Sequence, residues 1–278
     1  EALAYAAGCS TPKGIFVAGG ENDAGISSKS WLITWNNTPD SIAFLNLPDL
    51  PLPLTNASAV SVGDLVYVAG GETYLKASDL LFCINLQQIE KGWETLQPIP
   101  VPVSHFVFLY NEEQSKLYLV GGRKKNDSGI STIYNSLYSY DITGNQWQEE
   151  APLPYPLSAG TGVLQHDNIL LIGGDKGETF SKTEQLIAAI KNEEDETRRN
   201  ELTIEKNNLQ QSHPGFSKEI LEYNLKDQQW RVHSAFPFET PVTTTAVSIN
   251  SRLFIPSGEI KAGVRTPAII TGIAVENK

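Results

Sequence analysis

The sequence predicts an all-β protein of the β-propeller class, and three observations support this prediction. A short apolar run followed by two glycines occurs four times, as GIFVAGGE, DLVYVAGGE, KLYLVGGR and NILLIGGD, and a fifth copy reads RLFIPSGE. Successive copies are separated by 51, 51, 52 and 84 residues. Two of the repeats also carry a Tyr followed seven residues later by a Trp. A period near 50 residues indicates propeller blades rather than a helical solenoid.

Each repeat contains the same predicted order of strands. A first strand of small, alternating residues precedes the apolar run, as in NASAVSVG and SAGTGVLQH. The run itself is the second strand, and glycines end it because residues without a Cβ allow close backbone approach where blades crowd together. An aromatic third strand and a fourth strand opened by Trp follow, as in YSYDITGNQW and LEYNLKDQQW. We interpret Tyr140, Trp147, Tyr223 and Trp230 as core anchors between blades rather than a sugar-stacking surface.

Together these features form the kelch pattern, so we expect one kelch-type β-propeller domain over residues 1–278. Five copies indicate about five blades in this chain. The last blade lacks its Trp-opened outer strand, and the N-terminal EALAYAAGCS begins inside a first strand. A closed ring leaves no open edge. We therefore expect six blades in the complete protein, with one blade before residue 1; a five-bladed ring closed by an unusual element is the alternative.

The 84-residue spacing predicts an insert of about 32 residues, between about residues 176 and 217. The segment SKTEQLIAAIKNEEDETRRNELTIEKNNL predicts one or two amphipathic helices, with Leu186, Ile187 and Ile190 on an apolar stripe. Because the insert follows a diglycine, we expect it between the second and third strands of its blade. A solvated decoration and a lid or assembly surface are both open interpretations.

Composition excludes several classes of function. A net charge of −11 argues against a nucleic-acid partner. No apolar run is long enough to span a membrane, so no membrane partner is expected. The chain contains no Met and shows no signal peptide at its start, which leaves its compartment open. Cys9 and Cys83 lie in apolar strand-like runs and are interpreted as small buried hydrophobes rather than redox or nucleophilic groups.

Charged residues directly follow the repeated glycines. In chain order they are Glu21, Glu72, Arg123, Asp175 and Glu259. Loops between strands line the mouth of a propeller channel, so a ring of charge at one mouth is expected. The alternative is that acidic residues only close turns, and the sequence favours it for Glu21, Glu72 and Asp175. Glu72 and Arg123 are retained as candidate substrate-binding residues, although Arg123 leads into RKKNDSG, which also fits a solvated basic loop.

The four histidines are His105, His166, His213 and His233, and no two of them stand at metal-ligand spacing. The sequence therefore predicts no metal site, and it lacks the His, Tyr and Cys set that galactose oxidase uses for copper. His105, at the start of an inner strand near a channel mouth, is a candidate substrate-binding residue. His213, in QSHPGF at the end of the insert, is another. His166 lies in the predicted hairpin turn QHDN and is expected to face solvent.

The fifth copy continues as SGEIKAGVR, in which Glu259 and Arg265 flank a tight loop that Gly263 permits. If this loop folds back, both side chains can enter one channel mouth. A carboxylate there can act as general acid and base, and an arginine can bind a carboxylate bidentately. A salt bridge on the rim is the alternative, and the residues alone favour it.

The segment GEIKAGVRTPAI resembles the signature loop of the sialic acid mutarotases, also called N-acetylneuraminate epimerases, which are kelch propellers. GGENDAGISSKSWLITW and GGRKKNDSGISTIYNSLYSYDITGNQW also look like blades of that family, so the resemblance covers most of the chain. The loop stands near the C-terminus rather than in mid-chain, which is similar to a circularly permuted branch. The resemblance places the catalytic pair of the family on Glu259 and Arg265.

The resemblance implies a bacterial mutarotase for N-acetylneuraminate or a related sugar acid, in a periplasmic or secreted location. It implies that Glu259 transfers protons, that Arg265 holds the sugar carboxylate, and that neither a metal nor an organic cofactor is needed. A non-enzymatic kelch propeller that binds a protein or glycan is the alternative. A mutarotase-like fold with a changed substrate is a third interpretation. The exact sugar, the oligomeric state and the role of the insert stay open.

Overall fold

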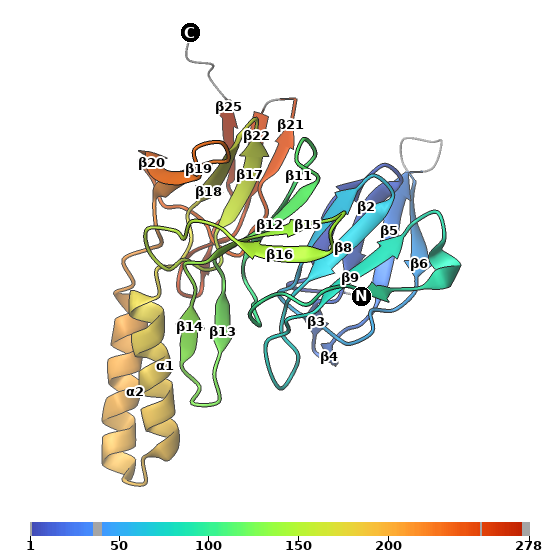
Figure 1. Ribbon diagram of the computed structural model, residues 1–278. Coiled ribbons are helices and arrows are strands. Elements are labelled where there is room, and N and C mark those ends of the chain that lie inside the picture. The colour runs from blue at the N-terminus through green and yellow to red at the C-terminus, as the bar shows by residue number, and fades with distance from the viewer. Residues whose placement is uncertain (1, 36–40, 251, 274–278) are drawn as a thin grey trace. The chain divides into compact units, whose positions relative to one another are not determined.

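The computed structural model in Figure 1 describes residues 2–35, 41–250 and 252–273. The chain divides into two compact units, each of which is described by itself. The first unit contains the residues up to Val120 together with Leu137–Glu150, and the second contains Gly121–Ser136 and the residues from Ala151 onwards. One domain over residues 1–278 stays a prediction, and its ends at residues 1 and 274–278 lie outside the described residues.

Three antiparallel sheets of four strands form the first unit. The first sheet contains β1 (Ala7–Thr11), β2 (Gly14–Ala18), β5 (Ser30–Trp35) and β6 (Ile42–Leu47). The second contains β7 (Ser58–Val62), β8 (Leu65–Ala69), β9 (Leu81–Asn85) and β10 (Glu94–Thr95). The third contains β11 (Val107–Asn111), β12 (Lys116–Val120), β15 (Leu137–Asp141) and β16 (Gln146–Glu149). The short strands β3 (Glu21–Asn22) and β4 (Gly25–Ile26) and the 3₁₀-helix η1 (Ile89–Lys91) lie between these strands in sequence.

The second unit contains two further sheets, two hairpins and two helices. The fourth sheet contains β17 (Thr161–Gln165), β18 (Asn168–Ile172), β19 (Glu219–Asn224) and β20 (Gln229–Ala235). Within the described residues the fifth sheet has three strands, β21 (Val247–Ile249), β22 (Arg252–Pro256) and β25 (Ile269–Ile273). The hairpins are β13 (Arg123–Lys125) with β14 (Ser131–Ile133), and β23 (Glu259–Lys261) with β24 (Val264–Arg265). The helices are α1 (Glu178–Asn192) and α2 (Glu196–Gln211).

The predicted all-β propeller class is confirmed, because four sheets repeat one antiparallel strand order with the diglycine after the second strand. The fifth sheet repeats the first three of these strands, with Ser257 and Gly258 after the second. The aromatic anchors lie where predicted. Tyr140 is buried with its ring centroid 5.0 Å from that of Trp147, and Tyr223 stands at the same distance from Trp230. The indole N–H groups of Trp93, Trp147 and Trp230 donate to the backbone oxygens of Pro48, Gln97 and Ala151. Within the first unit, Pro48 and Gln97 follow the outer strand of the preceding sheet, so Trp93 and Trp147 join consecutive blades there.

The glycine signature also has the predicted physical cause. Gly19, Gly70 and Gly121 have φ angles of 67°, 59° and 61°. A Cβ on these three glycines would lie 2.3, 2.4 and 2.3 Å from a backbone oxygen of the link into the next blade. Ser257 adopts the same left-handed conformation, with φ 55°, and its hydroxyl donates to the Thr266 oxygen at 2.8 Å. The fifth copy therefore keeps the backbone geometry of the repeat although it carries a side chain.

The predicted insert is a pair of helices between β18 and β19, the second and third strands of the fourth sheet. In Figure 1, α1 and α2 lie side by side, with hairpin β13–β14 next to them. The Glu184 carboxylate joins α1 to β14 by accepting from the backbone N–H and hydroxyl of Ser131 at 2.6 and 2.9 Å. Leu186 and Ile190 are half-buried, whereas Ile187 is 51% exposed, so the apolar stripe is narrower than predicted.

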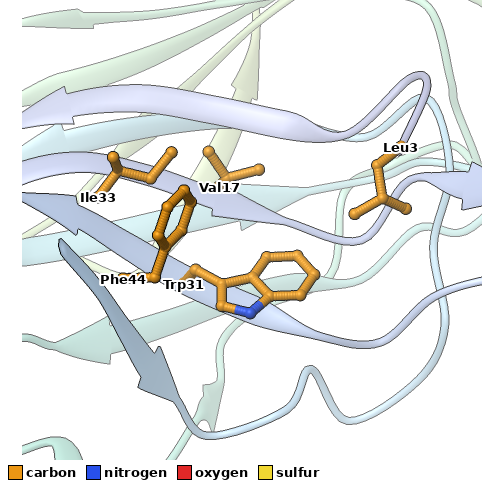
Figure 2. A pocket seen from close by; sticks show the side chains of 5 residues that line it. All are labelled: Leu3, Val17, Trp31, Ile33 and Phe44. Atoms are coloured by element: carbon orange, nitrogen blue, oxygen red, sulfur yellow. The ribbon is translucent and has the colours of Figure 1, made fainter. Parts of the chain in front are cut away.

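A cavity of about 270 Å³ lies against the first sheet (Figure 2) and is lined by Leu3, Val17, Trp31, Ile33 and Phe44. Val17 pairs with Trp31 and Ile33 with Phe44 across the strands, so these four side chains share one face of the sheet. Phe44 is 68% exposed, which leaves this face apolar and open to water. The lining residues include no ionisable group. The cavity therefore has no group that could hold a carboxylate, and the candidate site lies elsewhere.

The two cysteines occupy strands, as predicted. Cys9 lies in β1 and Cys83 in β9, and neither forms a disulfide. Burial raises the pKa of both thiols to about 12. Since the thiolate is the reactive form of cysteine, both groups are unreactive near neutral pH.

Candidate functional site

Glu259 and Arg265 stand opposite each other in the hairpin β23–β24 of the second unit. Residues that face each other across an antiparallel pair project their side chains from the same face. The loop therefore folds back as predicted, with its turn at Gly263, whose φ is 72°. The Glu259 Oε1 atom accepts the Gly263 backbone N–H at 2.8 Å, and the Arg265 side chain is exposed. A carboxylate and a guanidinium are thus presented together on one face of a tight hairpin.

Backbone bonds fix the base of this hairpin. Glu259 exchanges two hydrogen bonds with Val242, of 3.0 and 2.8 Å. The Thr266 N–H donates to the Gly258 oxygen at 2.9 Å, and the Ser257 hydroxyl bonds the Thr266 oxygen. Glu259 and Arg265 are therefore held by strand geometry rather than by a loose loop, which is the kind of preorganisation that a binding or catalytic site needs.

Asp175 is the equivalent residue of the fourth sheet, and it exchanges backbone bonds with Ser158 in the same way. Its Oδ1 atom accepts the Gly177 N–H at 2.7 Å, so the turn-closing role that the sequence favoured is present. The carboxyl is also part of a charged cluster. Burial raises the pKa of Asp175, the Gly177 N–H and the nearby His213 and Arg123 side chains oppose this rise, and the Glu259 carboxylate adds to it. All three side chains are therefore close enough to act on the Asp175 carboxyl.

Arg123 begins hairpin β13–β14, where it pairs with Ile133. Its guanidinium lies 4.7 Å from the ring centroid of Phe180 in α1, a cation–π contact. The interpretation of RKKNDSG as a loose, solvated loop is therefore wrong, because Arg123–Lys125 form a strand and the Arg123 side chain is half-buried. The helical insert thus orients a basic residue of the site.

His213 follows the C-terminal end of α2 and is only 7% exposed. Its Nδ1 atom accepts the Gly215 N–H at 3.0 Å, and its ring lies 5.0 Å from that of Phe216. An acceptor at Nδ1 places the proton of the neutral ring on Nε2. The structure thus holds one tautomer of a buried imidazole near Asp175.

Glu72 and His105 belong to the first unit, where the structure brings them together. The Ser104 hydroxyl donates to Glu72 Oε1 at 2.5 Å, and His105 Nδ1 lies 3.7 Å from the same oxygen. The prediction that His105 begins a strand is wrong, because β11 begins at Val107 and His105 has a left-handed φ of 54°. This conformation is incompatible with a strand residue.

A series of left-handed residues was not predicted from the sequence. Tyr5, Asn56 and His105 in the first unit, and Ala159 and Thr243 in the second, precede the first strands of their sheets and have φ angles of 50–57°. Within the first unit, Asn56 N–H donates to the Tyr5 oxygen and His105 N–H to the Asn56 oxygen; within the second, Thr243 N–H donates to the Ala159 oxygen. Such conformations are costly for residues other than glycine and cluster at functional sites. None of these positions is a glycine, so no signal in the sequence indicates the left-handed conformation.

Other candidates lie outside this cluster. His166 is exposed in the turn between β17 and β18, as predicted. His233 Nδ1 lies 2.6 Å from Oε2 of Glu222, a buried carboxylate that also accepts from Arg231. Within the described part of the chain, no three His, Cys, Asp or Glu side chains gather as a metal site would require. No helix among the described residues is long and apolar enough to cross a bilayer.

Comparisons with known proteins identify relatives of this chain. A curated N-acetylneuraminate epimerase of Salmonella typhi is 31% identical over 230 residues, which cover 80% of this chain and 57% of that protein. One from Haemophilus influenzae strain PittEE is 26% identical over 225 residues and is covered to the same 57%. This chain thus spans little more than half the length of the curated relatives that it matches. A solved structure described as "Structure of YjhT" shares the fold, with a TM-score of 0.68 at 20% identity, over 81% of this chain and 64% of that one.

The model of one protein family covers most of the sequence. The family is described as N-acetylneuraminate epimerase, and the match extends over residues 47–278, which include Arg123, Asp175 and the complete β23–β24 hairpin. The chain therefore belongs to the N-acetylneuraminate epimerase family.

Proposed function

We propose that this protein is a sialic acid mutarotase, which interconverts the anomers of N-acetylneuraminate or of a related sugar acid. The register of β23–β24 carries the proposal, because it presents the Glu259 carboxylate and the Arg265 guanidinium on one face. Membership of the family supports the same function, since its curated relatives bear the name N-acetylneuraminate epimerase.

The proposed reaction opens the sugar ring at the anomeric carbon and closes it on the opposite face. Glu259 takes the proton of the anomeric hydroxyl as the ring C–O bond breaks, and the ring oxygen receives a proton in the same step. When the ring closes again, the ring oxygen gives up that proton and Glu259 returns its own to the carbonyl oxygen. Arg265 binds the sugar carboxylate through two parallel N–H donors and so places the anomeric carbon beside Glu259. Only protons are transferred, and we propose that no metal or organic cofactor takes part.

The Arg265 guanidinium favours an acidic sugar over a neutral sugar as the substrate. A neutral hexose offers no carboxylate for Arg265, whereas a sugar acid forms a charge-assisted, bidentate pair with it. The protein carries a net charge of −11, so a local cation is needed to attract an anionic substrate. Arg123, half-buried in the same unit, supplies a second positive charge.

The test is NMR exchange spectroscopy between the α and β anomers of N-acetylneuraminate in the presence of the intact protein. Glu259→Gln should slow the catalysed exchange by about 10²- to 10⁴-fold, the range typical of general acid–base groups. Arg265→Lys keeps the charge but loses the planar fork, and we expect it to lower kcat/KM mainly through a higher KM. Glu112→Gln is the matched control, because Glu112 is exposed in the turn between β11 and β12. Exchange no faster with the intact protein than in buffer would refute the proposed function.

A further inference from the structure

Ring opening needs two proton transfers, one at the anomeric hydroxyl and one at the ring oxygen. Glu259 accounts for the first. Asp175 occupies the same repeat position in the neighbouring fourth sheet, directly after the diglycine. Both residues exchange a pair of backbone hydrogen bonds with the link before the first strand of their sheet, Asp175 with Ser158 and Glu259 with Val242. The two carboxylates therefore leave the same end of two consecutive sheets, and the charge of Glu259 acts on Asp175.

The surroundings of Asp175 suit a group that carries a proton. Burial raises its pKa, and the nearby negative charge of Glu259 acts in the same direction. Both effects favour the neutral, protonated carboxyl. His213 and Arg123 oppose this shift, so they keep the group able to release its proton. A pair of carboxyl groups whose environments differ is the usual arrangement for one acid and one base.

Hydrogen bonding leaves one carboxyl oxygen of Asp175 available. Oδ1 is occupied by the Gly177 N–H, which fixes the orientation of the carboxyl. Among the described residues, no side chain or backbone group hydrogen-bonds the other oxygen, Oδ2. The buried ring of His213 makes its only side-chain hydrogen bond within the described chain through Nδ1, so Nε2 is also left for a bound molecule or water. Asp175 Oδ2 and His213 Nε2 thus belong to two well-fixed side chains that lie near each other, and neither atom has a hydrogen-bond partner within the described chain.

We propose that Asp175 is the second proton-transfer group of the site, which delivers a proton from Oδ2 to the ring oxygen while Glu259 removes the proton of the anomeric hydroxyl. This inference rests on the proposed mutarotase function. In the opening step the ring C–O bond breaks, a carbonyl forms at the anomeric carbon, Asp175 becomes a carboxylate and Glu259 becomes protonated. In the closing step, the oxygen that left the ring attacks the other face of the carbonyl. Asp175 takes back its proton, Glu259 returns its own, and no proton is gained or lost overall.

The decisive variant is Asp175→Asn, because asparagine has the same shape and its Oδ1 can still accept the Gly177 N–H. We expect kcat for anomer exchange to fall about 10²- to 10⁴-fold, with KM changed less than about threefold. In the intact protein, the rate should fall as pH rises through the pKa of Asp175, which lies above the ordinary aspartate value. That fall should be absent from the residual activity of Asp175→Asn. Asp227→Asn, in the exposed turn between β19 and β20, is the matched control and should leave both the rate and the pH profile unchanged.

The possible outcomes are distinguishable. If the intact protein catalyses exchange and Asp175→Asn retains its rate within about twofold or keeps the fall at higher pH, the role of Asp175 is refuted and the mutarotase function stands. If the intact protein gives no exchange above buffer, both proposals are wrong. The unfolding midpoint distinguishes misfolding from a catalytic defect. It should stay close to that of the intact protein in Asp175→Asn, because asparagine keeps the bond to the Gly177 N–H. Sugar binding measured by calorimetry provides a second check, and it should persist in this variant.

Discussion

Gly121 and Ser257 occupy the same repeat position in the second unit. Exchanging glycine and serine at these two positions tests whether close backbone approach explains the glycine signature. In Gly121→Ser the new Cβ would lie 2.3 Å from the Leu157 oxygen, well inside the ordinary contact distance of about 3.5 Å. That oxygen accepts the Gly122 N–H at 2.8 Å, and displacing it weakens a bond worth about 1 kcal/mol. The left-handed conformation adds about 1–2 kcal/mol for a residue with a Cβ. We expect a total destabilisation of about 3 kcal/mol.

The reverse change, Ser257→Gly, should be nearly neutral. Glycine adopts the left-handed conformation without strain, which should stabilise the folded state by about 1 kcal/mol. The variant also loses the exposed hydrogen bond to the Thr266 oxygen and gains conformational freedom in the unfolded state, and these two effects together should destabilise it by about 1 kcal/mol. Urea unfolding measures both changes. With an m-value of about 3 kcal/mol/M, Gly121→Ser should lower the midpoint by about 1 M and Ser257→Gly should move it by less than about 0.2 M. Equal midpoint shifts for the two variants would refute the close-approach explanation of the repeat.

Three further predictions concern stability. Trp147→Phe keeps the ring against Tyr140 but loses the indole bond to Gln97, so the free energy of unfolding should fall by about 1 kcal/mol, while Trp35→Phe, at an exposed position, should change little in urea unfolding. Glu222→Gln should cost about 1.5–3 kcal/mol in the same assay, because the 3%-exposed carboxylate accepts from Arg231 and contacts His233. Hydrogen bonds from Tyr155 and Lys176 lower the pKa of Glu219. The contribution of Glu219 to the free energy of unfolding is therefore fully present above the ordinary glutamate pKa and is lost as pH falls through the lowered pKa. Acidification should therefore lower the thermal stability of Glu219→Gln less than that of the intact protein. The difference should be less than about 1 kcal/mol, because the Lys176–Glu219 ion pair is partly exposed.

The repeat could be predicted because its signals are local. A glycine pair with left-handed φ and a Trp seven residues after a Tyr each report contacts inside one blade or with the next one. The insert was equally clear, since α1 and α2 fall within the residues that break the period. These features need no knowledge of the distant parts of the chain.

The cluster around Asp175 could not be predicted for the opposite reason. Arg123, Asp175, His213 and Glu259 come from four separate segments, and their proximity depends on how hairpin β13–β14 and the helical pair pack in the second unit. The cation–π contact of Arg123 with Phe180 is one example, because nothing in RKKNDSG indicates a helix partner. The sequence predicts a turn-closing role for Asp175, and its bond to the Gly177 N–H agrees with that role. The charged and polar side chains that also surround Asp175 come from distant segments, so no local pattern indicates them.

The position after the diglycine shows how one repeat can supply both structure and chemistry. Three of its four acidic residues accept a nearby hydrogen bond: Glu72 from Ser104, Asp175 from Gly177 and Glu259 from Gly263. That shared bond fixes the direction of each carboxylate and accounts for an acid there without any catalysis. The surroundings of Asp175 are distinctive, since burial raises the pKa of its carboxyl beside a second carboxylate and two basic side chains. A structural position thus becomes a candidate for proton transfer where the insert and the last hairpin place polar and charged side chains around it. Asp175→Asn removes the transferable proton while it keeps the structural bond to Gly177.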